Sequence, residues 1–562
     1  MLRITNGRVY DPANGVEGVV RDVLIVEGRI AAALPEGVRE AALKTIDAKG
    51  MIIMPGGVDI HCHIASASVN RARAMLGEEH ATHVHPAACG LALRGGTGEL
   101  TPSTFTTGYR YAALGYTTAI DAAVSPTGAR QTHMELADTP NLDAAFLLLV
   151  GNHAKVLDLL DKDDETGAVA FIGEMLHQTG AYGIKIVNPG GVASWRSDAT
   201  QHMVDSLDQS VAGLKRVTPR RILQLAAAAA EQLNLPHAPH VHCNRLGLPG
   251  NVDLTLDTLD ALDGRRLHLT HLQFHAYGKS DKGEITSAAT RLTDHLDTHP
   301  LVSADVGQVM FGSAMTLTAD TPLEHLLWKL AGKRATGQYV SIEGEMEAGC
   351  GLMPIEYSDK HYLHSLQWAI GLELMLTAKD PWRMLLSTDH PNGGSFLTYP
   401  RIIAALMSRT IRQEQMSAAH PRAMRDSSLK DLSREMTLSE IAIITRAGPA
   451  RVLGMMHKGQ LGPGADGDVT IYDEGLAGSG GGGDWQRIFE SPRYVIKGGH
   501  VLVEDGELRE AVDGARMCSS VTASEQGSRH LREWFDQHGS YDVSQFGIRD
   551  RAREQMRAVN SK

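Results

Sequence analysis

Residues 51–66 read MIIMPGGVDIHCHIAS, and this stretch decides how the rest of the chain is interpreted. An apolar run ends at Pro55-Gly56-Gly57, and the short stretch Val58-Asp59-Ile60 then leads to His61 and His63. Alternate residues of a β-strand point to the same face, so the two imidazoles are aimed at one point. Such convergence suits a transition metal, although two unrelated histidines at a strand end would give the same pattern.

Short apolar runs alternate with longer helical segments after residue 57, which is typical of repeated βα units. The clearest helix is 221–234, RILQLAAAAAEQLN, with five consecutive alanines. Eight strands in this order predict an α/β fold, a (β/α)8 barrel of the TIM type. We expect the strands at 58–62, 117–121, 145–150, 183–187, 239–243, 266–271, 301–305 and 384–389.

Both ends of the chain have the character of small β-structures. We expect hairpins at Asn6-Gly7 and at Glu27-Gly28, and strands resume at 494–497 and 500–503. Thr437 and Glu440 have the spacing of a helix capping box. The predicted organisation is a β-sandwich from residues 1–54 and 449–515, a barrel over 55–448, and a polar extension over 516–562 that we expect to lie on a partner.

Composition limits the function classes. The chain has 562 residues, 43% of them hydrophobic, and a net charge of -12. An acidic chain is a poor nucleic-acid binder, because phosphate contacts require an excess of Lys and Arg. There is no continuous apolar run of about 18 residues, so no membrane segment is expected. Five scattered cysteines without a C-x-x-C pair suit a reducing, cytoplasmic compartment.

Further metal ligands are expected at the carboxyl ends of the barrel strands, where active sites of such barrels lie. Lys185 in GIKIV is the most informative candidate, since a lysine inside a strand is expensive to desolvate. Carbon dioxide would convert it into an anion able to bridge two metal ions; the alternative is a lysine paired with an aspartate. Nearer the strand ends, His242 is preferred to His240 and His271 to His268, and Asp389 ends LLSTD.

PGGVDIHCH, a strand lysine, two later strand histidines and a terminal aspartate, in that order, resemble the amidohydrolase superfamily. GQLGPGADGDVTIYD is similar to the stretch by which such enzymes return to an N-terminal sandwich. ASASVNRARAM, HVHCNRLGLPGN, HLTHLQFHAYG and STDHPNGGSF resemble, more narrowly, the alpha subunits of formylmethanofuran dehydrogenases and of bacterial formyltransferase/hydrolase complexes.

The resemblance implies a metal-dependent hydrolase that releases formate from an N-formyl amine carrier, methanofuran or an analogue, in one-carbon metabolism. It implies one or two zinc ions, with Asp389 as the residue that moves the proton. It also implies a formyltransferase subunit, together with further scaffold subunits, as partners. The implied ligands are His61, His63, Lys185 (carboxylated), His242, His271 and Asp389.

Three further residues are expected near the substrate. Asn244 and Arg245 follow the fifth strand and are candidates to hold the formamide or formate, although Arg245 is equally suited to a structural ion pair. His390 is a candidate to hydrogen-bond behind the ligands. His153 is a weaker candidate, and His237, His275 and His299 are assigned to loops or surfaces.

Two long insertions, 65–107 and 306–380, separate barrel strands, and we expect the first, with His80, His83 and His85, to lie over the barrel mouth. Two other functions stay open at this point. One is a cyclic amidohydrolase acting on a dihydropyrimidine or hydantoin ring, which would use the same ligands. The other is a non-catalytic scaffold protein.

Overall fold

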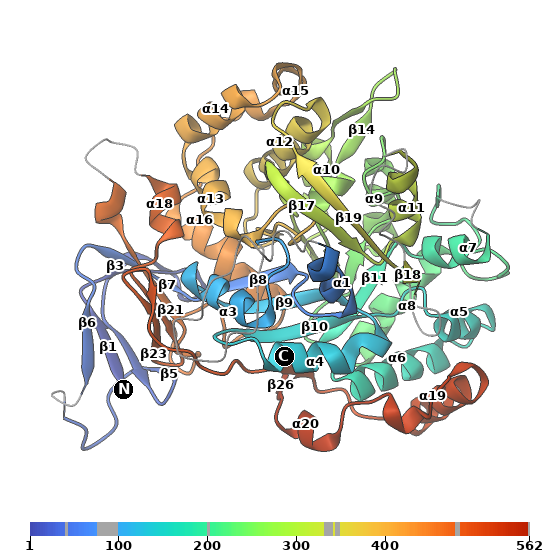
Figure 1. The fold of residues 1–562 in the computed structure, drawn as a ribbon, viewed down its shortest axis with the longest axis horizontal. Helices are drawn as coiled ribbons and strands as arrows, with labels where there is room; N and C mark the ends of the chain where they lie inside the picture. The colour runs from blue at the N-terminus through green and yellow to red at the C-terminus, as the bar shows by residue number, and fades with distance from the viewer. Residues whose placement is uncertain are drawn as a thin grey trace.

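The computed structural model describes residues 1–39, 43–75, 99–198, 203–330, 341–342, 349–477 and 484–559. The predicted His80, His83 and His85 lie outside these residues. Figure 1 shows a barrel with its surrounding helices next to a β-structure that contains strands from both chain ends. Among the described residues, none of the helices combines the length and apolar character needed to span a bilayer.

The predicted barrel is confirmed. Eight parallel strands follow one another in sequence order around the sheet, and the first and last meet through a bridge between Cys62 and His390. They are buried on both faces, which explains their nearly continuous apolar runs. Their bounds are β8 (Gly57–Cys62), β9 (Tyr116–Val124), β10 (Asp143–Leu149), β11 (Gly183–Val187), β12 (His240–His242), β13 (Leu267–Leu269), β16 (Val302–Asp305) and β20 (Met384–Leu385).

Helices connect the strands on the outside of the barrel. The alanine-rich segment forms α8 (Pro219–Gln232), whose alanines and leucines pack on the sheet. Thr437 and Glu440 form the predicted capping box at the start of α16 (Leu438–Ala442). The other main helices around the barrel are α3 (Thr104–Ala113), α4 (Ala129–Ala137), α5 (Ala154–Asp161), α6 (Glu165–Thr179), α9 (Val252–Ala261), α10 (Ala289–Asp297), α12 (Tyr362–Thr377) and α13 (Tyr399–Met407).

The β-structure beside the barrel has two sheets around a separate apolar core. One sheet has the order β5-β4-β1-β6 and the other β24-β23-β22-β21-β7-β2-β3, so strands from both chain ends share the larger sheet. The strands are β1 (Leu2–Thr5), β2 (Arg8–Asp11), β3 (Val16–Val20), β4 (Val23–Val26), β5 (Arg29–Ala31), β6 (Lys44–Asp47), β7 (Met51–Pro55), β21 (Val469–Asp473), β22 (Tyr494–Lys497), β23 (His500–Glu504) and β24 (Glu507–Leu508).

One predicted hairpin is confirmed and the other is wrong. The turn at Glu27-Gly28 joins β4 and β5 as an antiparallel pair. The turn at Asn6-Gly7 joins two strands that do not pair, because β1 pairs with β4 and β6 while β2 pairs with β3 and β7. Asn6 has the left-handed φ of 62° that the turn residues suggested, but the chain uses it to pass from one sheet to the other.

The C-terminal extension lies on its own barrel, which corrects the expectation that it lies on a partner. Its helix α19 (Glu525–His538) packs on α6 and buries Leu531, Trp534 and Phe535. β25 (Met517–Ser519) and β26 (Arg557–Val559) then pair in parallel beside β10. Figure 1 shows α19 below α6, away from the sandwich strands.

The second insertion forms a small structure of its own. β17 (Gly312–Thr318) and β19 (Gly349–Tyr357) pair antiparallel, and α11 (Thr321–Leu330) packs against them. α1 (Ala67–Met75), from the first insertion, contacts the same pair of strands. Both insertions therefore contribute to one covering layer.

Candidate metal centre and its cavity

Three of the predicted ligands converge on one point. His61 lies near the end of β8, His63 follows that strand, and Asp389 follows β20. The Nε2 atoms of His61 and His63 lie 3.0 and 3.1 Å from the same Asp389 oxygen, Oδ1. Asp389 has a left-handed φ of 50°, a strained conformation for a non-glycine residue that is typical of functional sites.

His271, also at a left-handed φ (36°), completes a cluster with His61 and Asp389 in which the ligand atoms lie within 4.8 Å of one another. His242 lies beside this cluster, with its ring 4.7 Å from that of His271. Lys185 is buried in β11 and its Nζ donates to Thr270 Oγ1 at 3.4 Å. All six predicted ligands thus line or border one cavity.

Burial and charge alter the acidity of these groups in opposite directions. Burial lowers the pKa of Lys185 to about 8, against the effect of Asp389 and Asp305. Burial alone would lower the pKa of His61, but Asp305 and Asp389 outweigh it and raise that pKa to about 9. Burial would raise the pKa of Asp389, yet His61 and His271 hold it well below the usual range. Asp389 is therefore an anion near neutral pH.

Asp305, the last residue of β16, holds the ligands from below and was missed by the sequence analysis. Its Oδ2 accepts from His61 Nδ1 at 3.2 Å and from His268 Nε2 at 3.1 Å. Its Oδ1 accepts from the backbone N–H of His271 at 3.0 Å and from the Ser387 hydroxyl. The available signal was its place at the end of an apolar strand, the same signal that identified Asp389.

The histidines set in reserve lie under the site. His240 Nε2 is 3.1 Å from His61 Nδ1, and His237 Nε2 is 3.0 Å from His240 Nδ1. The assignment of His237, His275 and His299 to loops or surfaces is wrong, since all three are buried. His275 stacks on His271 with ring centroids 5.4 Å apart. Spacing along the sequence did not show that the loops after the strands turn back into the protein.

The predicted substrate residues occupy different environments. Asn244 is buried and its Nδ2 donates to Asn188 Oδ1 and to the Pro189 carbonyl, so it fixes the loop beside the site. Arg245 forms an ion pair with Asp205, and the cavity wall formed by the described residues includes Leu246 but not Arg245. The structure thus places Arg245 in the structural ion pair that the sequence left open.

Two further histidines of the sequence analysis lie behind the site or away from it. The His390 carbonyl accepts from the His63 backbone N–H at 2.7 Å, and its ring Nδ1 accepts from Phe396 N. His390 therefore holds His63 in place from behind. His153 accepts from Lys155 N as the N-cap of α5 and packs against Trp534 of α19, so it does not point into the cavity.

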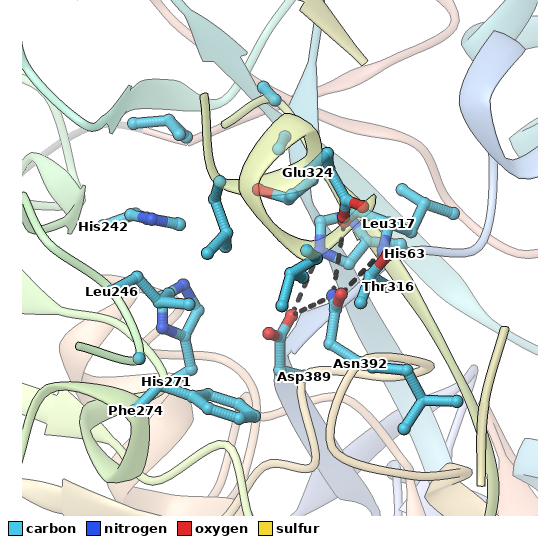
Figure 2. Close-up of a pocket in the computed structure, with 18 of the residues that line it drawn as sticks. His63, His242, Leu246, His271, Phe274, Thr316, Leu317, Glu324, Asp389 and Asn392 are labelled. Atoms are coloured by element: carbon cyan, nitrogen blue, oxygen red, sulfur yellow. Dashed lines mark hydrogen bonds and ion pairs between the residues drawn. The ribbon is translucent and has the colours of Figure 1, made fainter. Parts of the chain in front are cut away.

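The cavity over the cluster has a volume of about 280 Å³, and its wall is largely apolar. Figure 2 shows Leu246, Phe274 and Leu317 around a space bordered by His63, His242, His271 and Asp389. The covering insertion adds two acids that the sequence analysis did not select. Asp320 lies 3.2 Å from His242 Nε2, and Glu324 on α11 borders the cavity.

The donor set fits a metal ion. Four imidazoles, one carboxylate and one amine surround a small buried space, and His/carboxylate sets suit zinc. Within the described part of the chain, His271 Nδ1 is buried without a hydrogen-bond partner, as is His242 Nε2 apart from its charge contact with Asp320. Buried unpartnered nitrogens are costly unless something else binds them. A bound cation would satisfy them.

The barrel, the strand-end ligands and the sandwich built from both chain ends define a metal-dependent amidohydrolase. The chain belongs to the amidohydrolase family, whose model matches residues 44–503. Over 99% of this chain and 98% of the relative, it is 37% identical to protein FwdA of Methanocaldococcus jannaschii. Over 98% of this chain and 97% of the relative, it is 36% identical to FhcA, the first-lettered component of the formyltransferase/hydrolase complex Fhc of Methylorubrum extorquens.

The comparison with solved structures agrees. The chain superposes with a TM-score of 0.89 and 35% identity on a chain of the formyltransferase/hydrolase complex FhcABCD from Methylorubrum extorquens, crystallised with methylofuran; 99% of this chain and 98% of that chain are covered. Similarity to a dihydroorotase of Streptococcus pneumoniae is 39% identity over 97 residues, which is 17% of this chain.

Proposed function

We propose that the chain hydrolyses an N-formyl amine carrier to formate and a free amine, and that the carrier is of the methanofuran or methylofuran type. The single observation that supports this best is the nearly full-length likeness to FhcA, together with the solved FhcABCD complex that holds methylofuran. Both insertions, which cover the cavity, are included in that likeness. The likeness to dihydroorotases is confined to 17% of the chain or less, so a cyclic substrate is the weaker proposal.

The site residues suggest how the reaction proceeds. A zinc ion bound by His61, His63, His242, His271, Lys185 and Asp389 would polarise the formyl carbonyl and make water more acidic. Asp389, held as an anion by its histidine neighbours, accepts a proton from the attacking water. It then returns this proton to the amide nitrogen as the C–N bond breaks, which yields formate and the amine.

Lys185 is suited to carboxylation. Burial lowers its pKa to about 8, so a sizeable fraction of the amine is unprotonated near neutral pH. The neutral amine attacks carbon dioxide to give a carbamate and release one proton. The carbamate places a negative charge among four imidazoles, which explains why a buried lysine stands there. Whether one or two zinc ions are held is decided by elemental analysis of the purified chain.

We also propose that the chain works inside a complex with a formyltransferase subunit, together with further scaffold subunits, by analogy with the solved formyltransferase/hydrolase complex. A cytoplasmic location accompanies this proposal, and the three cysteines that the structure describes as free thiols, Cys62, Cys243 and Cys518, are buried. Co-expression with the proposed partners and co-purification on a tag carried by this chain tests the assembly.

The activity is tested by formate release from formylated methylofuran with the full chain and with Asp389→Asn. Loss of the proton-transferring group is expected to lower turnover by about 10²–10⁴-fold. Asp158→Asn is a matched control, because that carboxylate is on the outer helix α5 and pairs only with Lys162 among its described neighbours. Ring opening of a hydantoin in place of formate release would favour the cyclic substrate. Zinc-free protein with neither activity would favour the scaffold.

A further inference from the structure

Glu324 is the most unusual group in the cavity wall that the mechanism does not use. It lies on α11 of the second insertion, its side chain is fully buried, and it borders the same cavity as Asp389. Neither of its carboxylate oxygens has a hydrogen-bond partner among the described residues. Figure 2 shows Glu324 on the covering helix, across the cavity from Asp389.

The surroundings of Glu324 are arranged to hold it there. A Cβ atom at Gly351 of β19 would lie 1.7 Å from Glu324 Cγ, so only a glycine at that position leaves room for the glutamate. The neighbouring wall is apolar, with Leu323 and Leu327 on the same helix and Ile355 on β19. Burial raises the pKa of Glu324 to about 8, and Asp320 adds to this effect. Such a group gains most from a ligand that donates hydrogen bonds or carries positive charge.

The other polar groups of this wall are already used. Gln367 donates to Tyr277, His364 accepts from Ser358 N, and Asn392 bonds both Leu317 and Asp389. Only Thr316, whose hydroxyl is also without a partner in the described part of the chain, shares the condition of Glu324. The covering layer therefore offers one localised acceptor within an otherwise apolar space.

We propose that Glu324 binds the nitrogen of the substrate, accepting the N–H of the formamide and then the ammonium of the product, and that it thereby selects neutral formamides with an apolar substituent. This inference rests on the proposed hydrolysis of a formyl amine. The same carboxylate, together with Asp389, repels a substrate with a carboxylate next to its nitrogen. Formylated amino acids are thus excluded, whereas an arylmethyl formamide fits the apolar wall.

Two probes that differ by one carboxylate test the selection: N-benzylformamide and N-formylphenylglycine. The full chain is expected to release formate from the first at least about 100-fold more efficiently, judged by kcat/KM. In Glu324→Gln this ratio is expected to shrink at least about tenfold. The glutamine has the same size and carries no charge, and a thermal melt confirms that the variant is folded. Glu356→Gln is the matched control, since that exposed carboxylate lies on the same strand, β19, and accepts from Ser313.

Binding of benzylamine by calorimetry separates this inference from the proposed function, because it requires no turnover. The wild-type chain and Glu356→Gln are expected to bind the amine equally, and Glu324→Gln at least about tenfold more weakly, as loss of a charge-assisted hydrogen bond implies. Equal binding by Glu324→Gln, or no binding by the wild type, overturns the role of Glu324. Absence of formate release by the wild type from any formamide, with amine binding intact, overturns the proposed function instead.

Discussion

Replacing Asp305 by asparagine tests whether the carboxylate beneath the site sets the metal affinity. Asp305 accepts from His61 and His268 through one oxygen and from His271 N and Ser387 through the other. An asparagine retains one oxygen and turns an NH2 group toward the other pair of donors. At least two hydrogen bonds are therefore lost, and one His61 or His271 contact is among them.

The size of the effect follows from the role of such carboxylates. Loss of a group that orients a metal-bound histidine typically weakens metal affinity by about 10–100-fold, or about 1.4–2.8 kcal/mol. We expect zinc to be removed from Asp305→Asn at a correspondingly lower concentration of a competing chelator. The assay is a chelator titration of the purified full chain with zinc content read by elemental analysis.

Two controls make the test specific. Asp158→Asn removes an exposed carboxylate of α5 and should titrate as the wild type does. A thermal melt of the zinc-free proteins measures any general loss of stability separately. Zinc affinity of Asp305→Asn within twofold of the wild type would refute the reasoning, because it would mean that His61 and His271 are oriented without this carboxylate.

Three other changes have definite expected outcomes. Lys185→Ala should lose zinc in elemental analysis and lower formate release at least about 100-fold; full activity would refute its role. His153 is buried and neutral with its pKa lowered to about 3, so the unfolded chain alone takes up its proton below pH 6.5 and stability falls on acidification. This group contributes about 2 kcal/mol to the difference between pH 8 and pH 5, and His153→Asn should lack that part in urea unfolding at the two pH values. Lys458→Met leaves Asp143, Asp466 and Asp468 without their shared cation and should cost about 3–5 kcal/mol in calorimetry, whereas the exposed Lys162→Met should melt as the wild type does.

The barrel was predictable because its strands carry a local signal. Strands buried on both faces are apolar throughout, and GIKIV at 183–187 coincides with β11. The same logic placed His61 and Asp389, because polar residues that end such strands meet at one end of the barrel. The prediction 384–389 was longer than β20, which ends at Leu385, since the following residues leave the sheet to form the site.

Contacts between distant segments were not predictable in this way. Asn6-Gly7 has good hairpin residues, but the choice between pairing its flanking strands and sending them to different sheets depends on β4, β6 and β7. Glu324 lies in a helix whose sequence shows no sign that it will face the ligands. Its position results from the packing of α11 on β17 and β19, which only the three-dimensional structure shows.

The shared seven-stranded sheet has a consequence for the synthesis of the chain. β7 pairs antiparallel with β21, which is about 400 residues further along. At a ribosomal rate of about 5–20 residues per second, the edge of β7 waits roughly 20–80 s for this partner. During that time β7 presents the apolar side chains Ile52, Ile53 and Met54 on a strand without its neighbour. The nascent chain is thus exposed to edge-to-edge association, and a chaperone that covers the first 55 residues would act in this interval.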